Sequence, residues 1–171
     1  MPRIIVIAIS LLLAGCVTYS SSGGQSVNVG SHLNYATKSG RLAVMVLGQP
    51  LLGNQGKIEA MFVRALDSNF SGLKTTFAPT KVTVPTTDKI LLVFDPEATD
   101  ISSELCKAPS EAKSSHQGPK MRAGMIFCFG HARAEAWATL ARPASVSDPL
   151  LAEVIDGLAF HMIPDRQSNS Y

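Results

Sequence analysis

RLAVMVL, residues 41–47, is the segment from which we infer the fold of this chain. It is a short apolar run between Gly40 and Gly48, and such a run bounded by turn residues indicates a buried strand. After a glycine-containing connection, apolar residues recur at helical spacing: Ile58, Phe62, Ala65, Leu66 and Phe70. Charged residues separate them, so we expect an amphipathic helix after the strand, with Asn54 as its N-cap.

The segments after this helix differ in how strongly their sequences predict a strand. Residues 73–77 and 81–84 are short extended pieces that prolines interrupt, whereas residues 89–94, KILLVF, form a stronger strand ended by a turn. Residues 97–122 are polar and carry two prolines and a glycine. Their composition predicts a long loop.

The last part of the chain returns to regular structure. Residues 123–129 predict a strand, and residues 130–133 turn the chain into a second strand at residues 134–141, although alanine and glutamate there favour a helix by propensity. Asp148 is placed to cap a final helix with Pro149 at its first position, where the missing N–H costs nothing. The core face of this helix is Leu151, Val154, Ile155, Leu158, Ala159 and Met162.

The order of these elements predicts an α+β fold. We expect a mostly antiparallel sheet of four to five strands with two helices packed on one face. The expected limits are a single globular domain at residues 35–165 and a C-terminal tail at residues 166–171.

The chain begins with a short apolar segment, MPRIIVIAISLLLAGC, residues 1–16. Arg3 supplies one positive charge, and the apolar run is about half of the roughly 20 residues that a membrane-spanning helix needs. These features are typical of a secretory signal. The last four residues, LAGC, resemble the lipobox, the cleavage and lipidation signal of bacterial lipoproteins. A simple secretory signal and a buried strand with an unmodified cysteine are the alternatives.

The lipoprotein resemblance implies a membrane anchor. Residues 1–15 are then removed as a signal peptide, Cys16 carries a diacylglycerol thioether, and the new amino terminus is acylated. Several acyl chains give a stable attachment, whereas one chain binds only marginally. Val17 is not the aspartate that retains enterobacterial lipoproteins at the inner membrane, so we expect the periplasmic face of the outer membrane. Residues 16–34, rich in serine and glycine, are expected to be a lipidated flexible tether.

Charge and length limit the classes of partner. Without residues 1–15, the chain keeps 156 of its 171 residues, enough for one domain with its own core. It then has 14 basic and 13 acidic residues, because Arg3 is the only charged residue removed. The basic residues are scattered, so nothing indicates nucleic-acid binding. We expect the membrane, through the N-terminal lipid, and an envelope protein or peptidoglycan as partners, and no cofactor.

Cys106 and Cys128 remain once Cys16 carries lipid, and a pair of cysteines in an exported protein predicts a disulfide. Two alternatives stay open. One is a metal or catalytic-thiol site in which His131 joins the two cysteines, with His116 or water as a fourth zinc ligand. The other is a pair of unbonded cysteines.

We expect no catalytic, cofactor-binding or metal-binding residues. The GxSxG and HExxH motifs do not occur, and no pair of acids is marked out for glycoside hydrolysis. The connection after residue 48 has the context of a phosphate-binding loop, but Leu51 and Ile58 stand where that loop needs glycine and serine or threonine.

Four other side chains are candidates for a role in binding or catalysis. His32 and His161 are expected to be structural. Tyr35 and Trp137 are the aromatic residues best suited to face a partner, although core packing is the expected place of Trp137.

Much of the chain resembles a group of small proteobacterial lipoproteins. The resemblance lies in residues 34–50, in the strand ending at residues 94–96, in Leu105 and Cys106, and in Cys128. It implies paired cysteines and no particular activity.

The expected function is a non-enzymatic binding, adaptor or structural domain of the cell envelope. The alternative is a periplasmic envelope hydrolase whose site lies in residues 97–122 or near His131. A serine, histidine and aspartate site is recognised by geometry rather than by spacing, so the sequence leaves this alternative open.

Overall fold

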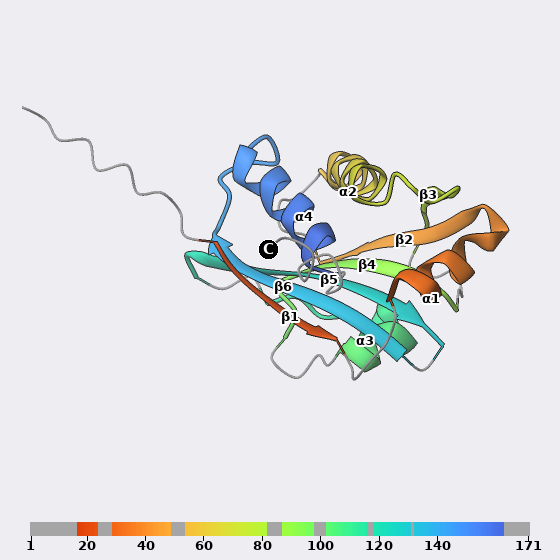
Figure 1. The fold of residues 1–171 in the computed structure, drawn as a ribbon. Coiled ribbons are helices and arrows are strands. Elements are labelled where there is room, and N and C mark those ends of the chain that lie inside the picture. Colours follow the sequence, from red (N-terminus) through yellow and green to blue (C-terminus); the bar gives the residue numbers. More distant parts are fainter. Residues whose placement is uncertain are drawn as a thin grey trace, which may run out of the picture.

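A six-stranded sheet in the order β1-β6-β5-β4-β2-β3 forms the centre of the structure, which is a computed structural model (Figure 1). It describes residues 17–23, 29–48, 54–81, 87–97, 102–115, 118–130 and 132–162. The strands are β1 (Thr18–Gly23), β2 (Arg41–Leu47), β3 (Thr76–Pro79), β4 (Lys89–Phe94), β5 (Lys120–Phe129) and β6 (Ala132–Ala141). The helices are α1 (Val29–Ala36), α2 (Gln55–Asn69), α3 (Ser102–Lys107) and α4 (Pro149–His161), with 3-10 turns at Thr37–Ser39 and Pro109–Glu111.

The sheet is mixed. β4, β5, β6 and β1 are antiparallel neighbours, whereas β2 runs parallel to both β4 and β3. Parallel neighbours need a crossover connection, and α2 supplies it between β2 and β3. The α+β class is therefore confirmed. The predicted sheet of four to five mostly antiparallel strands with two helices is only roughly right, because the described residues form six strands and four α-helices.

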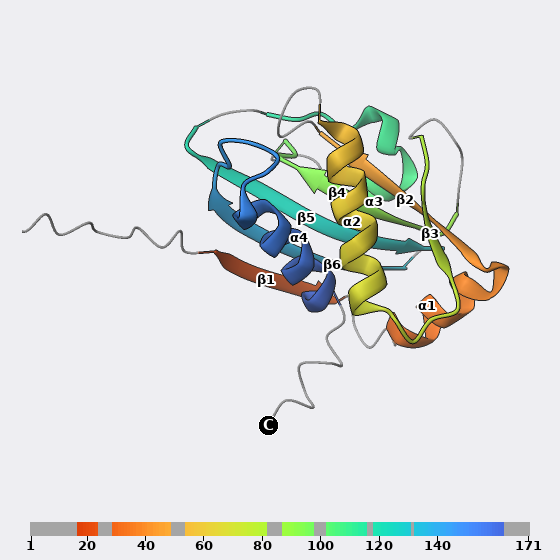
Figure 2. The ribbon, with the colours of Figure 1, turned by 90° about the horizontal axis from the view of Figure 1, so that it is seen from above.

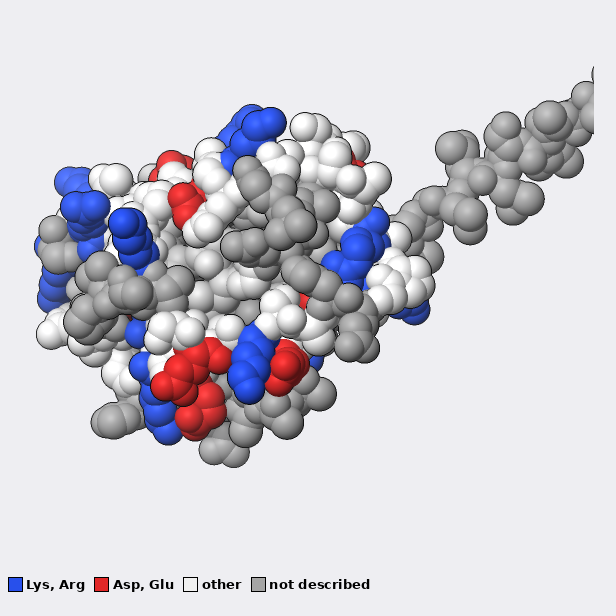
Figure 3. Space-filling model, turned by 180° about the vertical axis from the view of Figure 1, so that it is seen from behind, with Lys and Arg blue, Asp and Glu red and all other residues white. Residues whose placement is uncertain are grey.

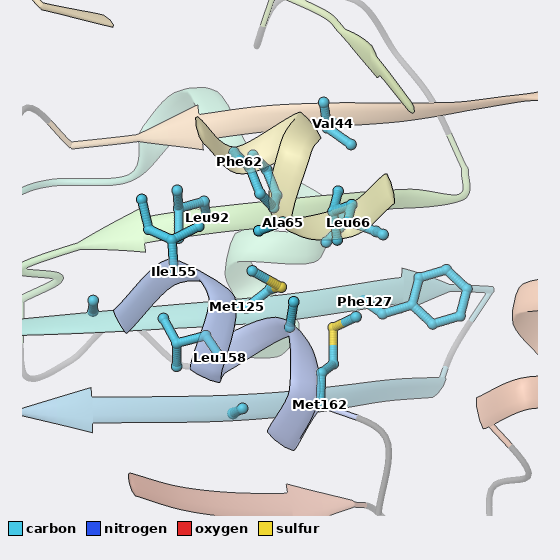
Figure 4. Packing of buried hydrophobic residues seen from close by; sticks show 14 of the residues in the cluster. Val44, Phe62, Ala65, Leu66, Leu92, Met125, Phe127, Ile155, Leu158 and Met162 are labelled. Carbon is cyan, nitrogen blue, oxygen red and sulfur yellow. The ribbon is translucent and has the colours of Figure 1, made fainter. Parts of the chain in front are cut away.

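α2 and α4 lie over one face of the sheet (Figures 1 and 2). Alternate residues of the central strands point toward them, as the two-residue repeat of a strand requires. The expectation that two helices cover one face therefore holds for α2 and α4. Figure 4 shows buried residues of this core from β2, β4, β5, α2 and α4: Val44, Leu92, Met125, Phe127, Phe62, Leu66, Ile155 and Leu158.

α3 covers part of the opposite face of the sheet (Figure 1). Leu105 of α3 is buried there in a second apolar cluster that includes Leu91 and Ile126. The long loop predicted for residues 97–122 is therefore wrong where α3, the 3-10 turn and the start of β5 lie. A helix of six residues is too short to be stable alone, so its contacts with the sheet decide that it forms.

β5 and β6 form the hairpin predicted around residues 130–133. Their register runs from Lys120 opposite Ala141 to Phe129 opposite Ala132. Gly130, in the turn, has a φ of 54°, which glycine adopts without strain. The alanines of β6 at positions 134, 136 and 138 are buried in the core that α4 also lines, and their small side chains let the helix approach the sheet. Strand pairing thus overrides the helix propensity of this segment.

Both long helices begin where the sequence predicts. Asp148 Oδ1 accepts a hydrogen bond from the Leu150 N–H at 3.0 Å, and Pro149 takes the first position of α4. At the start of α2, the backbone carbonyl of Asn54 accepts a hydrogen bond from the Ile58 N–H at 3.2 Å. Asn54 is thus the N-cap residue, although its side chain makes no capping hydrogen bond.

Part of the predicted tether belongs to the folded domain. β1 pairs with β6 along its whole length, and Val17 packs against the main core. Val29 and Leu33 of α1 are buried in the same core. The expectation of a flexible tether is therefore wrong for β1 and α1, because serine-rich sequence does not prevent backbone pairing with the open edge of a neighbouring strand.

Other expectations fall on residues that the structure does not describe. The signal peptide at residues 1–15, the lipidation site Cys16 and the tail at residues 166–171 lie outside the described residues. Among the helices that are described, none has the length and apolar character to cross a membrane.

Candidate functional site

A disulfide between Cys106 and Cys128 joins α3 to β5. Their Cα atoms lie 5.6 Å apart, within the usual range for a bridge. The predicted bond is present, so these sulfurs are not available as zinc ligands or thiol nucleophiles. Within the described ranges, no three His, Cys, Asp or Glu side chains are grouped so as to hold a metal ion. His116 and His131, the other members of the alternative metal site, lie outside those ranges.

α3 has a second attachment to the sheet. The hydroxyl of Ser102, its first residue, donates a hydrogen bond to Glu135 Oε2 on β6. The disulfide lies near the other end of the helix, at Cys106. α3 is therefore tied to two neighbouring strands, and this part of the segment suggested for a hydrolase site has a structural role.

An ion pair between Asp95 and Arg142 closes one end of the sheet. Arg142 Nη1 lies 2.7 Å from Asp95 Oδ2, and the Arg122 N–H donates a hydrogen bond to Asp95 Oδ1 at 2.9 Å. The same guanidinium donates to the carbonyls of Gly118 and Lys120 at 3.1 and 3.0 Å. Asp95 has a positive φ of 45°. These bonds join the end of β4 to the start of β5 and the end of β6, and they leave the carboxylate engaged in structure.

The glycine after β2 has a packing role. Gly48 has a φ of 77°, and a side chain on it would overlap the carbonyl oxygen of Phe94. The close approach of the Gly48 and Phe94 backbones requires a glycine at position 48. Phosphate binding is therefore not needed to explain this glycine. Residues 49–53, the rest of the connection, lie outside the description.

Trp137 is buried, as expected from core packing. Its side chain is 8% exposed and lies against Gly124 on β5, while the Arg122 guanidinium lies 4.2 Å from the ring centroid. A cation over an indole face is an attractive contact. Trp137 is therefore a covered part of the sheet and offers little surface to a partner.

Tyr35 has the opposite environment. It projects from α1 with 68% of its surface exposed, and Lys38 Nζ lies 5.1 Å from its ring centroid. On the same helix, His32 stacks on Phe129 with ring centroids 4.5 Å apart. Phe160 of α4 is the other large apolar side chain recorded as exposed in the described part of the chain, at 39%. α1 and the 3-10 turn after it thus present an aromatic ring and a cation together, and the stack of His32 on Phe129 holds the helix in place.

Tyr19 packs β1 against α4. Its ring stacks on His161 with centroids 4.6 Å apart, and its hydroxyl occupies the space that a side chain on Gly157 would need. Burial raises the pKa of Tyr19, and the nearby charges of Glu153 and Asp156 raise it further. His161 therefore has a packing contact, in agreement with a structural role.

A groove of 390 Å³ runs between α2 and α4. Asn69 Nδ2 donates a hydrogen bond to Asp156 Oδ1 at 2.9 Å and links the two helices. The groove contains one cation and two carboxylates, so it does not select a ligand of one charge. Its lining residues are Met61, Arg64, Ala65, Ser68, Ala152, Glu153 and Asp156.

Charges of both signs are mixed on the surface. Figure 3 shows the face turned away from the viewer in Figure 1, and basic and acidic side chains lie next to one another on it. This mixed surface agrees with the nearly balanced composition.

No sequence motif marks Asp95, Arg142 or Phe160. The sequence indicates only a turn at Asp95, because the partner of its carboxylate lies 47 positions later in the chain. Phe160 did carry a signal, since it falls off the apolar face predicted for α4 and so had to point outward.

Comparisons with known proteins show a distant structural likeness. No protein-family model matches the chain, and no curated protein matches it. Among solved structures, the chain is similar to a point variant of PelC from Paraburkholderia phytofirmans, a dodecamer, with 9% sequence identity and a TM-score of 0.47 over 86% of this chain and 98% of that chain. This score is too low to transfer a partner, an assembly or an activity.

Proposed function

We propose that this protein is a lipid-anchored cell-envelope protein, held on the periplasmic face of the outer membrane, whose domain binds another envelope protein and does not catalyse a reaction. The residues 13–16, LAGC, support the anchor through their resemblance to a lipobox. The Cys106–Cys128 disulfide fits an oxidising compartment such as the periplasm.

The observation that carries the binding role is the exposure of Tyr35 beside Lys38. Large aromatic side chains bury much apolar area when they enter a partner, and tyrosine also keeps a hydroxyl for a hydrogen bond. Tyr35 is 68% exposed, although the helix that bears it is fixed to the core by Val29 and Leu33. A rigid helix with an exposed aromatic ring loses little conformational freedom on binding.

The non-enzymatic part of the proposal follows from how the reactive side chains are used. Cys106 and Cys128 are bonded to each other, and Asp95 is paired with Arg142. His32 and His161 have ring contacts. Each of these groups has a packing or bonding role that accounts for its position.

Photocrosslinking in intact cells tests the binding role. A photoreactive phenylalanine analogue at position 35 should give one defined protein adduct, and the same analogue at the exposed Asp67 of α2 should not. With the analogue moved to the neighbouring Asn34, the Tyr35→Phe change should preserve that adduct and Tyr35→Ala should remove it. Equal adducts at positions 35 and 67 would contradict the proposal.

An activity screen tests the non-enzymatic role. The purified domain, incubated with peptidoglycan, ester and peptide substrates, should give no turnover. Turnover that His131→Ala abolishes would establish the hydrolase alternative instead.

A further inference from the structure

The folded domain begins immediately after the proposed lipidation site. Val17 packs against the main core, and Thr18 pairs with Thr139 of β6. Cys16 precedes Val17, and consecutive Cα atoms are about 3.8 Å apart. A lipid on Cys16 is therefore attached within one residue of the core, with no spacer between the bilayer and the domain. This step rests on the anchor in the proposed function.

The topology defines which surface then meets the bilayer. β1 begins where β6 ends and β5 starts, at the left of Figure 1, and Ala141 is paired there with Lys120. We call this surface the anchor end and define it by Thr18, residues 118–120, Thr139 and Ala141, all of which are exposed. α1 lies toward the opposite end of the sheet (Figures 1 and 2).

The charges of the anchor end suit phospholipid headgroups. Lys120 is exposed there, and so is Arg122 two residues further along β5, whose guanidinium also lies over the Trp137 ring. Two acidic side chains nearby are engaged internally, because Asp95 is paired with Arg142 and Asp148 caps α4. Exposed lysine and arginine next to an anchored chain are attracted to lipid phosphates.

We propose that the anchor end docks directly on the headgroups of the leaflet that holds the lipid. Lifting this end from the bilayer would require Val17 to leave the core and β1 to separate from β6. The attachment keeps the anchor end at the bilayer surface, and the contacts of this end with the headgroups orient the domain so that α1 with Tyr35 points away from the membrane. β5 has ten residues, and at about 3.3 Å per residue it spans about 33 Å. The length of the sheet, rather than a tether, then sets how far from the bilayer a partner is met.

Fluorescence quenching in proteoliposomes tests the docking. The lipidated protein carries a single introduced label site at Ala141→Cys, the last residue of β6, or at Thr76→Cys, the first residue of β3. Both positions are exposed strand ends, and Thr76 pairs with Arg41 at the far end of β2. Vesicles containing headgroup-quencher lipids should quench the label at position 141 and leave the label at position 76 unquenched.

A spacer variant separates docking from anchoring. Ten glycine and serine residues inserted between Cys16 and Val17 should keep the protein on the vesicles and abolish the quenching at position 141. Equal quenching at positions 141 and 76, or quenching that survives the spacer, would overturn the docking. An intact mass that still contains residues 1–15 would instead overturn the anchor.

Discussion

The ring of Trp137 lies over Gly124, its direct partner across the β5–β6 pair, and fills the space that a side chain at position 124 would need. Overpacking of this kind typically costs about 1–3 kcal/mol. We therefore expect Gly124→Ala to lower the free energy of unfolding by about that amount, measured by urea denaturation. Gly56→Ala, in open space on α2, is the matched control and should change stability by at most about 1 kcal/mol in the stabilising direction. Equal effects of the two substitutions on the free energy of unfolding would show that the Trp137 ring can move aside without destabilising the fold.

The Asp95–Arg142 ion pair should be worth more than a surface pair. Asp95 is 6% exposed, so Arg142→Ala leaves a buried carboxylate without its cation, at a cost of about 2–4 kcal/mol. Arg142→Lys keeps the charge but loses the fork-shaped donor. Its free energy of unfolding should lie between that of the unchanged protein and that of Arg142→Ala. Lys107→Ala removes the exposed Lys107–Glu104 pair and should cost less than about 1 kcal/mol. A loss for Arg142→Ala no larger than this control would rule out the structural role of the pair.

The Cys106–Cys128 bond should contribute about 3 kcal/mol, because it closes a segment of 22 positions in the unfolded chain. The double change Cys106→Ala with Cys128→Ala should lower stability by that amount. A reductant should lower the stability of the unchanged protein similarly and leave the double variant unaffected. Amide exchange should also become faster across α3, which the bond ties to β5. Unchanged exchange there would mean that Leu105 and Ser102 are sufficient to hold the helix.

Stability at alkaline pH should depend on Tyr19. The folded-state pKa of Tyr19 is raised by burial and by Glu153 and Asp156, so the folded state holds the phenolic proton more tightly than the unfolded chain. The resulting stabilisation is complete below the unfolded value of 10.0 and is lost as the pH rises through the folded value. Unfolding midpoints between pH 8 and pH 11 should therefore fall more steeply for the unchanged protein than for Tyr19→Phe. Parallel curves for the two proteins would contradict this.

Lys89 acts in the opposite direction over the same pH range. Burial lowers its pKa, with Asp88 opposing the shift, so its contribution to stability increases as the pH rises through the folded value. This rise is common to the unchanged protein and to Tyr19→Phe. The difference between the two curves therefore reports Tyr19 alone.

The positions of the regular elements could be predicted where a periodic apolar pattern was long enough. The helical repeat located α2 and α4, and short apolar runs located β2, β4 and β5. The N-cap positions of Asn54 and Asp148 were also predictable, because capping depends on residues that are adjacent in the chain, although only the Asp148 side chain makes a capping hydrogen bond. The disulfide was predictable as a pair from the cysteine count together with the signal for export.

β1 and α3 could not be predicted from the sequence pattern of their own segments. β1 is a serine-rich strand and α3 has six residues, so neither carries an apolar repeat. Each forms because of distant contacts, β1 with β6, and α3 with β5 and β6 through Leu105, Ser102 and the bond to Cys128. The same reason explains why the exposure of Tyr35 and the burial of Trp137 became definite only in the fold.

The order of amino acids is enough to establish which segments are apolar, where α2 and α4 begin, and which two cysteines are available to pair. The strand order, the parallel pairing of β2 with β3 and β4, and the pairing of β1 with β6 become defined only in the folded domain. Strands pair through backbone N–H and C=O groups, which are the same in almost every residue. The neighbour of a strand therefore depends on the burial of whole faces of the sheet and on the connections between strands. A local sequence pattern does not predict it.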